Sequence, residues 1–297
     1  MRNHIQIRPV KNALEMKNIH VAWARKEGWN PGVHDHDFFY ETDPGGFLVC
    51  TVDQEPVSCI SLVNYNEQYA FLGYYIAAPR YRHQGYGWRI WQAAMERAGD
   101  REIGLDGVVS EQDNYKKSGF IPCFSSMRYA LTQSPTGSGL ADSEFSFIPG
   151  VDCDPLLLLN YDEKHAGTRR PHFITRLVSC PDTFSFVAIS KKNHEMVGLG
   201  VIRKADSGYR VGPLFSNSID IVRSLLQMLC DQVNISTDSP VFLDVPACNR
   251  AGMEIVTQYN MKPVFECARM IKPSLHAVRT TTLPTQQIFG ITSWELG

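Results

Sequence analysis

The sequence lacks an excess of charge of either sign. Its 29 Lys and Arg residues nearly balance 31 Asp and Glu residues, which gives a formal net charge of −2 at pH 7. The balance also holds locally, since residues 1–131 carry 14 basic and 15 acidic side chains. Domains that bind nucleic acid usually present a basic face. We therefore expect neither half of the chain to bind nucleic acid.

Long apolar runs are missing as well. No stretch approaches the roughly 18 apolar residues that a membrane-spanning helix requires. The segment from Met1 to Gln6 contains no apolar core of the kind found in signal peptides. These absences predict a cytoplasmic protein without a membrane partner.

The eight cysteines are not arranged for disulfides or for a metal. They are scattered along the chain without a C-x-x-C pair, and no histidines stand at zinc-finger spacing. We expect reduced thiols that pack as small apolar groups, and no metal site.

The chain contains enough apolar material for two cores. It has 297 residues, of which 43% are hydrophobic, and a typical domain has roughly 150 residues. A polar stretch rich in Pro, Gly and Ser separates two apolar halves at about residues 132–146. We therefore predict one domain over residues 1–131, a linker, and a second domain over residues 147–297.

The first half alternates between strand-like and helix-like segments. Residues 5–9 alternate as in a strand, Asn12 is placed to cap a helix, and a short helical region ends at about Tyr40. The pattern then predicts strands at 46–52, 56–65 and 69–77, a helix at 85–98, a strand at 102–110, a helix at 112–118 and a strand at 123–131. The three consecutive strands predict an antiparallel meander.

The second half repeats the end of this order. Pro122 and Arg128 lie 141 residues before Pro263 and Arg269, each pair after a helix and inside a strand. The context agrees, because a similar apolar run that contains an Asp precedes each set. Two domains of one fold are therefore predicted.

The most informative stretch runs from an apolar strand at 74–78 through a glycine turn into a helix. Gly85 and Gly87 allow backbone amides to approach an anion closely, and the helix N-terminus adds a partial positive charge. The Lys-Ser/Thr of a P-loop is absent, and Ile90 replaces the third glycine of a dinucleotide fingerprint. The turn therefore predicts a phosphate site of another kind, or else a tight turn that holds no ligand.

The turn resembles the R/Q-x-x-G-x-G/A signature of the GNAT acetyltransferase superfamily through Arg82, Gly85 and Gly87. Downstream, residues 114–120 are similar to the family's Tyr-x-x-x-Gly-Phe helix end. Segments spread over the whole chain also look like a tandem-domain GNAT group of unassigned substrate. The resemblance implies an α/β protein of two GNAT-like domains, each with a mixed, mostly antiparallel central sheet flanked by helices.

The resemblance also implies acetyl-CoA as co-substrate and indicates which residues hold it. Ile76, Ala77 and Ala78 are expected to pair by backbone with the pantetheine arm, because strand-edge amides can bind a peptide-like chain. The remaining expected cofactor-binding residues are Arg82, His83, Gln84, Gly85, Tyr86 and Gly87, which would bind the pyrophosphate, and Asn114.

Acetyl transfer to an amine requires a proton donor for the leaving sulfur. Tyr115 stands at the family's phenol position, and a phenol with a pKa near 10 is protonated at pH 7. Tyr115 is therefore the candidate general acid. The other interpretation is a core tyrosine that donates to a backbone carbonyl.

A general base is harder to find. The strand at 69–77, where many family members carry a Glu, contains no carboxylate. Asp106, inside an apolar run of the next strand, is the leading substitute, although such a residue can also hold a turn or cap a neighbour. Nothing marks Cys123 as a reactive nucleophile, so we expect direct attack in a ternary complex.

The acceptor is expected near the segment that follows the first helical region. The resemblance places this segment over the acceptor site, where Trp29, Asn30, His34 and Asp35 are the candidate substrate-binding residues. A metal is not expected there, because histidines two residues apart, such as His34 and His36, do not share a helix face.

The second half does not preserve the cofactor site. When the corresponding strands are aligned, Ile219 and Ile221 take the places of the two glycines, and Val256 takes the place of Tyr115. β-Branched residues tolerate neither a positive φ nor the close approach of a phosphate. We expect a degenerate GNAT-like domain that is structural or lines an acceptor cleft.

These patterns together predict an acetyl-CoA-dependent N-acetyltransferase that acts on a primary amine of a small molecule or a peptide. An alternative of another class is a non-catalytic acyl-CoA-binding sensor or scaffold, in which the turn binds its ligand but no base completes the site.

Overall fold

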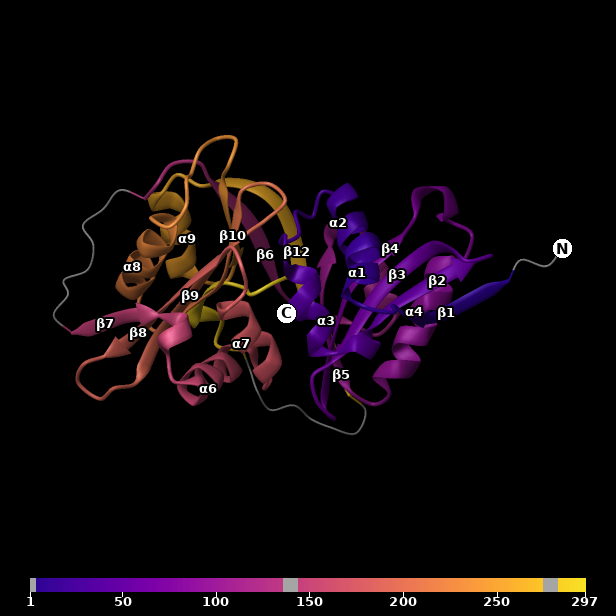
Figure 1. Ribbon diagram of the computed structural model, residues 1–297, viewed down its shortest axis with the longest axis horizontal. Coiled ribbons are helices and arrows are strands. Elements are labelled where there is room, and N and C mark those ends of the chain that lie inside the picture. Colours follow the sequence, from indigo (N-terminus) through magenta and orange to yellow (C-terminus); the bar gives the residue numbers. More distant parts are fainter. Residues whose placement is uncertain (1–3, 136–143, 275–282) are drawn as a thin grey trace.

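The computed structural model describes residues 4–135, 144–274 and 283–297. Of the linker predicted at 132–146, residues 136–143 lie outside these ranges. The described residues form one sheet of thirteen strands, with helices packed against it (Figure 1). Only two strand pairs on its path are parallel, β4 with β5 and β10 with β11. The predicted α/β class with a mixed, mostly antiparallel sheet is confirmed.

The elements follow the predicted order. The first half contains β1 (Ile5–Pro9), α1 (Ala13–Met16), α2 (Ala22–Lys26), α3 (Asp35–Thr42), β2 (Phe47–Val52), β3 (Glu55–Asn64), β4 (Tyr69–Ala77), α4 (Tyr86–Ala98), β5 (Glu102–Val108), α5 (Gln112–Lys117) and β6 (Ile121–Leu131). The second half contains β7 (Phe145–Pro149), α6 (Pro155–Ala166), α7 (Pro171–Val178), β8 (Thr183–Ser190), β9 (Met196–Lys204), β10 (Tyr209–Ser216), α8 (Ile219–Cys230), β11 (Val241–Pro246), α9 (Arg250–Gln258), β12 (Lys262–Lys272) and β13 (Ile288–Gly290).

Local sequence explains several of the element ends. The Asn12 side chain accepts a hydrogen bond from the amide of Glu15 and caps α1, as predicted. α4 begins after Gly85 and ends before Gly99, and both glycines have positive φ angles that other residues rarely adopt. The predicted meander is also present, since β2, β3 and β4 pair antiparallel in sequence.

The last long strand of each half lies against the other half. β12 pairs with β5 of the first half, and β6 pairs with β11 of the second half. β6 and β12 also pair with each other, which joins the two halves into one sheet. The two halves therefore exchange strands. Each half's part of the sheet is completed by a strand from the other half of the chain.

Two buried ion pairs connect the exchanged strands to their new neighbours. Arg128 on β6 donates from Nε and Nη2 to the two carboxylate oxygens of Asp244 on β11, at 2.7 and 2.8 Å. Arg269 on β12 binds Asp106 on β5 in the same way, at 2.9 and 2.8 Å. The two arginines that repeat along the sequence thus each bind a carboxylate of the opposite half.

The halves also share a hydrophobic core. Phe39 on α3 stacks on Phe173 on α7 with ring centroids 5.8 Å apart, within a cluster of buried residues drawn from both halves. Residues 291–297 run through this junction, and Figure 1 shows the end of the chain near the centre of the molecule. The Trp294 indole donates to Ser126 on β6, which ties this C-terminal segment to an exchanged strand.

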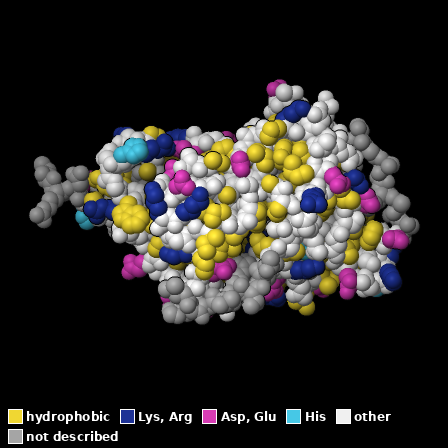
Figure 2. Space-filling view, turned by 180° about the vertical axis from the view of Figure 1, so that it is seen from behind, with side chains coloured by type: hydrophobic (Ala, Val, Ile, Leu, Met, Phe, Trp, Pro, Cys, Tyr) yellow, Lys and Arg dark blue, Asp and Glu magenta, His cyan; other side chains and the backbone are white. Residues whose placement is uncertain are grey.

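The surface agrees with the balanced composition. Figure 2, seen from behind, shows basic and acidic side chains interspersed over that face. Among the helices of the described residues, none combines the length and the hydropathy of a membrane span.

Replacing Asp244 with Ala is expected to destabilise the protein by about 3–5 kcal/mol, because the substitution leaves the buried guanidinium of Arg128 without its counter-charge. Urea denaturation at pH 7 measures this loss. Asp238→Ala, at an exposed position, is the matched control and should change the free energy of unfolding by less than about 0.5 kcal/mol. Equal effects of the two substitutions would contradict the role of the ion pair.

The contribution of Asp244 should also depend on pH in one direction. Burial disfavours its charged form, but the guanidinium groups of Arg128, Arg210 and Arg203 together outweigh burial and lower the pKa of the Asp244 carboxyl. The stabilisation is therefore present above the unfolded-state pKa of about 3.9 and is lost as the pH falls through the lower folded-state pKa. The difference in unfolding free energy between the original protein and Asp244→Ala should stay constant from pH 5 to pH 7 in urea titrations.

Candidate active site

The first half contains a split between two neighbouring strands. β4 and β5 run parallel and pair as far as Leu72 and Leu105, but β4 continues to Ala77 and β5 to Val108. An irregularity in β4 contributes to the divergence, because Tyr74 has a φ of +47° and the register with β3 shifts beside it. The split opens into a cavity of about 990 Å³.

The N-terminus of α4 borders this cavity. Gly85 precedes the helix with a φ of +83°, and no side chain caps the first turn. The amides of that turn are therefore open to a ligand, and the helix dipole favours an anion there. A β-carbon on Gly87 would lie only 3.0 Å from the hydroxyl of Tyr75. A larger residue at this position would therefore crowd the space through which a ligand reaches the first-turn amides.

Most of the predicted cofactor-binding residues lie in the cavity wall: Ile76, Ala77, Arg82, His83, Gly85, Gly87 and Asn114. Arg82 donates to the backbone oxygen of Ala77 at 3.0 Å and forms an ion pair with Glu27. Ala78, Gln84 and Tyr86 are not part of the wall. The Ala78 amide donates to β3, the Gln84 side chain donates within its own turn, and the Tyr86 ring packs on a neighbouring tyrosine.

Tyr115 also lies in the cavity wall. Its ring stacks on Trp91 with centroids 5.7 Å apart, and a β-carbon on Gly107 would approach the ring to 2.9 Å. Burial raises the pKa of the Tyr115 hydroxyl above its usual value near 10, so the phenol is protonated at neutral pH. The ring also packs against Phe120 within a buried cluster, so the interpretation as a core tyrosine stays open beside that of a general acid.

Asp106 lies in the cavity wall, but its carboxylate is engaged. Burial raises the pKa of this carboxyl, which taken alone suits a proton acceptor. Both oxygens, however, accept hydrogen bonds from Arg269, and the side chain has 0% exposure. The geometry assigns Asp106 to the strand exchange, which corrects its interpretation as the leading general base.

Of the four predicted acceptor-binding residues, Trp29 lines the cavity. Asn30 exchanges two hydrogen bonds with the turn between β9 and β10. Asp35 is fully buried and accepts from an arginine on β9 at 3.0 Å, and His34 lies 3.1 Å from an aspartate before β8. Asn30, His34 and Asp35 therefore join the two halves, and their assignment to the acceptor is corrected.

Part of the cavity wall comes from the second half, as in one of the two roles expected for it, but from residues that the sequence did not single out. β12 contributes Phe265 and Cys267, and the C-terminal segment contributes Trp294 and Glu295. A β-carbon on Gly73 would lie 2.1 Å from the backbone oxygen of Glu295, so a glycine is required where this segment meets β4. The aromatic residues near the end of the chain were the available signal, but nothing in the sequence indicated where they pack.

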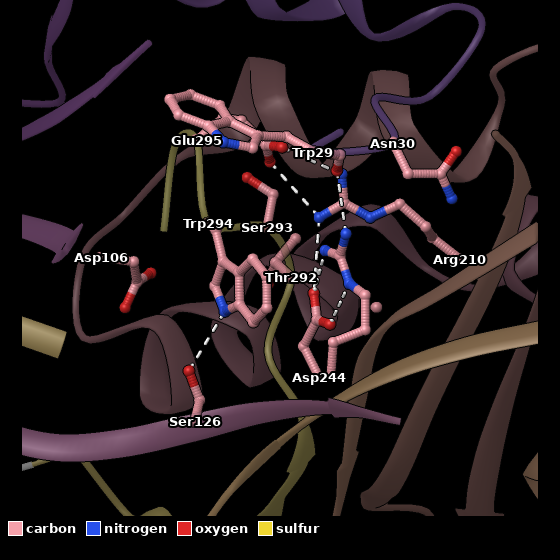
Figure 3. A network of polar contacts seen from close by, with 12 residues as sticks. Trp29, Asn30, Asp106, Ser126, Arg210, Asp244, Thr292, Ser293, Trp294 and Glu295 are labelled. Carbon is pink, nitrogen blue, oxygen red and sulfur yellow. Dashed lines mark hydrogen bonds and ion pairs between the residues drawn. The ribbon is translucent and has the colours of Figure 1, made fainter. Parts of the chain in front are cut away.

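The Glu295 carboxylate belongs to the buried charge network shown in Figure 3. It is 4% exposed and accepts from Arg210 at 3.0 and 3.4 Å. Arg210 also lies 3.5 Å from Asp244. The Arg128–Asp244 ion pair is therefore connected through Arg210 to Glu295 in the wall of the cavity.

Known sequences show the same organisation. A profile described as Acetyltransferase (GNAT) family matches residues 14–120, and one described as Acetyltransferase (GNAT) domain matches residues 158–290. Holothin acyltransferase of Pseudoalteromonas sp. (strain SANK 73390) is 30% identical over 264 residues, which cover 88% of this chain and 86% of that protein. The chain belongs to the GNAT acetyltransferase family.

Solved structures share the fold of this tandem GNAT protein. A putative acetyltransferase from Pyrococcus horikoshii matches 99% of this chain and 96% of its own with a TM-score of 0.78, at 17% identity. A tandem GNAT protein from the clavulanic acid biosynthesis pathway matches 93% of this chain and all of its own, with a TM-score of 0.64 at 11% identity. The predicted fold of two GNAT-like domains is confirmed.

The first GNAT domain fits the acyl-CoA that this family normally uses. The split exposes the edge of β4 to a peptide-like arm, and the uncapped start of α4 offers amides to a diphosphate. Gly85, which has a positive φ, and Gly87 keep the space in front of these amides free of side chains.

The second GNAT domain has a split that the chain itself fills. β10 and β11 pair only at their first residues, and β13 then pairs with β10 inside the split. The Ile291 amide continues this pairing by donating to the backbone oxygen of Asp244. The Ser218 side chain caps the first turn of α8, and Ile221 there is buried. The expected loss of the cofactor site in this domain stays a prediction, which the titration below tests.

Gly85→Val is expected to weaken binding of coenzyme A by roughly 100-fold or more, because valine disfavours the positive φ and obstructs the first-turn amides. Gly99→Val at the other end of α4 is the matched control, since Gly99 also has a positive φ, of +57°. The control should lose stability but keep its affinity. Isothermal titration calorimetry measures both variants. Unchanged affinity in Gly85→Val would contradict the assignment.

The filled second split predicts one coenzyme A per chain in the same titration. Two equivalent sites would contradict the interpretation of β13 as an occupant of the second split.

Proposed function

We propose that this protein is an acetyl-CoA-dependent N-acyltransferase that transfers an acetyl group to a primary amine by direct attack in a ternary complex. The observation that carries the proposal is the split of β4 and β5 between an uncapped helix N-terminus and a protonated tyrosine. The second domain lacks the open split, the glycines and the tyrosine.

The residues of the first domain suit three tasks. The edge of β4 at Ile76 and Ala77 is placed to bind the pantetheine arm, and the turn from Arg82 to Gly87 is placed to bind the pyrophosphate. Tyr115 is placed to donate its proton to the sulfur that leaves the acetyl group. The acceptor then approaches from the part of the cavity lined by Trp29.

The names of the relatives support acyl transfer as the reaction. One protein that covers most of this chain is named for acyl transfer to holothin, and a structural neighbour is named for a biosynthetic pathway. Both favour a small molecule over a peptide as the acceptor of this protein.

One observation favours the alternative of an acyl-CoA sensor. The carboxylates of Asp106 and Glu295 are both paired with arginines, so neither is free to take a proton from an ammonium group. Release of free coenzyme A thiol from acetyl-CoA, measured with a thiol reagent over a panel of amines, separates the two functions. Amine-dependent release supports the enzyme, and tight binding without release supports the sensor.

Tyr115→Phe is expected to lower kcat by roughly 100-fold, the usual contribution of a general acid, while the Kd for acetyl-CoA changes less than about twofold. Because burial raises the pKa of this hydroxyl, the rate should not fall on the alkaline side until above about pH 10. The measurements are steady-state kinetics and calorimetry.

Tyr75→Phe is the matched control, since Tyr75 also lines the cavity and contacts Trp91. It should retain most of the activity. If both variants lose kcat and affinity together, Tyr115 is a packing or binding residue.

A further inference from the structure

One carboxylate of the cavity wall lies beside the candidate acid. Glu111 ends the short helical turn Val109–Glu111, which connects β5 to α5 and contacts β12. Tyr115 follows four residues later on α5, and residues four apart in a helix have neighbouring side chains. Both residues line the cavity. The cavity wall therefore presents a carboxylate and a phenol next to each other.

The carboxylate of Glu111 is held in place without being neutralised. Its Oε2 accepts a hydrogen bond from the Asn114 side chain, which carries no charge, at 2.9 Å. Among residues 4–135, 144–274 and 283–297, no arginine or lysine forms an ion pair with Glu111. The side chain is half-buried. Glu111 is therefore placed to take a proton from a ligand and to pass it to solvent.

The other carboxylates of the wall are less well placed. Asp106, Glu27 and Glu295 each form an ion pair with an arginine. Glu266 on β12 has no arginine partner in the described part of the chain, but burial and the Glu266 carboxylate together raise the pKa of Tyr129. Tyr129 packs against the core of the second domain and is not part of the cavity wall. The carboxylate of Glu266 is therefore directed toward that core.

Electrostatic repulsion couples Glu111 to Tyr115. Burial raises the pKa of the Tyr115 hydroxyl, and the Glu111 carboxylate raises it further. Burial and the same carboxylate also raise the pKa of Tyr75 on β4. A proton that arrives on Glu111 removes the negative charge that opposes ionisation of Tyr115. Protonation of Glu111 therefore makes Tyr115 a stronger acid.

An unneutralised carboxylate beside the acid restricts the acceptor. An alkyl amine has a pKa near 10.4 and arrives almost entirely as an ammonium ion at pH 7. A carboxylate attracts this cation and accepts its proton. An amine that is already neutral at this pH gains little from such a group.

We propose that Glu111 is the general base of the acetyl transfer, and that the acceptor is a primary alkyl amine that binds as an ammonium ion at this carboxylate. This inference rests on the proposed N-acyl transfer and specifies its base and the class of its acceptor.

The proton transfers and bond changes balance. The ammonium group gives one proton to Glu111, and the neutral amine attacks the thioester carbonyl. A carbon–nitrogen bond forms, the carbon–sulfur bond breaks, and the leaving sulfur takes the Tyr115 proton. The nitrogen, made acidic by the attack, returns a proton to the Tyr115 phenolate. Glu111 releases its proton to solvent, so each turnover of an ammonium ion liberates one proton.

The test uses Glu111→Gln, which removes the base but keeps an oxygen for the hydrogen bond with Asn114. Ethylamine is compared with trifluoroethylamine, which is similar in size but largely neutral at pH 7 because its fluorines withdraw electrons. Thiol release at saturating acetyl-CoA gives kcat/KM, and mass spectrometry confirms the N-acetyl product. The substitution should lower kcat/KM for ethylamine by roughly 100-fold and that for trifluoroethylamine by less than about threefold.

The pH dependence separates a base from a mere binding group. In the original protein the ammonium ion is the reacting form, so kcat/KM for ethylamine should stay flat from pH 6 to pH 8. In Glu111→Gln only the free base reacts, and the value should rise about tenfold per pH unit.

Neighbouring groups should not produce this difference. The other titratable side chains that line the cavity on the elements around Glu111 are Tyr75, Asp106, Tyr115, Glu266 and Cys267. Burial raises the pKa of the two tyrosines and of the thiol, which keeps them protonated at pH 8. Asp106 stays charged in its ion pair with Arg269.

Two further variants control for charge and for the competing carboxylate. Asp113→Asn removes a negative charge from an exposed position on α5 outside the cavity wall, and should change both amines by less than about twofold. Glu266→Gln tests the other carboxylate that lacks an arginine partner. The Kd for acetyl-CoA and thermal melts show whether each variant is folded.

The outcomes separate the inference from the proposed function. Equal losses for both amines in Glu111→Gln, or a loss confined to ethylamine in Glu266→Gln instead, would overturn the inference. A tenfold rise per pH unit in the original protein, or transfer to neither amine, would do the same. Whether the original protein acetylates any other amine of a broad panel then decides the proposed function on its own.

Discussion

The structure depends on two buried arginine–carboxylate pairs that cross between the halves of the chain. Arg128 binds Asp244 and Arg269 binds Asp106, each through two parallel hydrogen bonds. An unpaired charge at such depth is strongly unfavourable, so each arginine requires the strand of the opposite half beside it. The pairs therefore specify the strand exchange, and the exchange makes one continuous sheet from two repeated domains.

The exchange also determines what the cavity is made of. Since β12 lies beside β5, residues of the second domain such as Phe265 form part of the wall of the first domain's split. The C-terminal segment follows, and Glu295 connects the wall to Arg210 and Asp244. The first domain thus provides the glycine turn and the tyrosine, while the rest of the cavity wall is built from both domains.

The features of the fold and the site that depend on short stretches of sequence could be predicted. The order of strands and helices in the first half, the Asn12 cap and the positive φ required at Gly85 follow from short patterns. The strand exchange could not be predicted, because the repeat reveals equivalent residues but not their partners. Asp106 and Arg269 are 163 residues apart in the sequence, and a lone Asp in an apolar strand looks the same whether it is paired or catalytic.

The segment that fills the second split couples the two domains mechanically. β13 occupies this split through main-chain pairing with β10. The same pairing positions the chain that follows, including Trp294, at the wall of the first domain's cavity. Any ligand that entered the second split would have to displace β13, and the wall of the distant cavity would lose Trp294 and Glu295 with it.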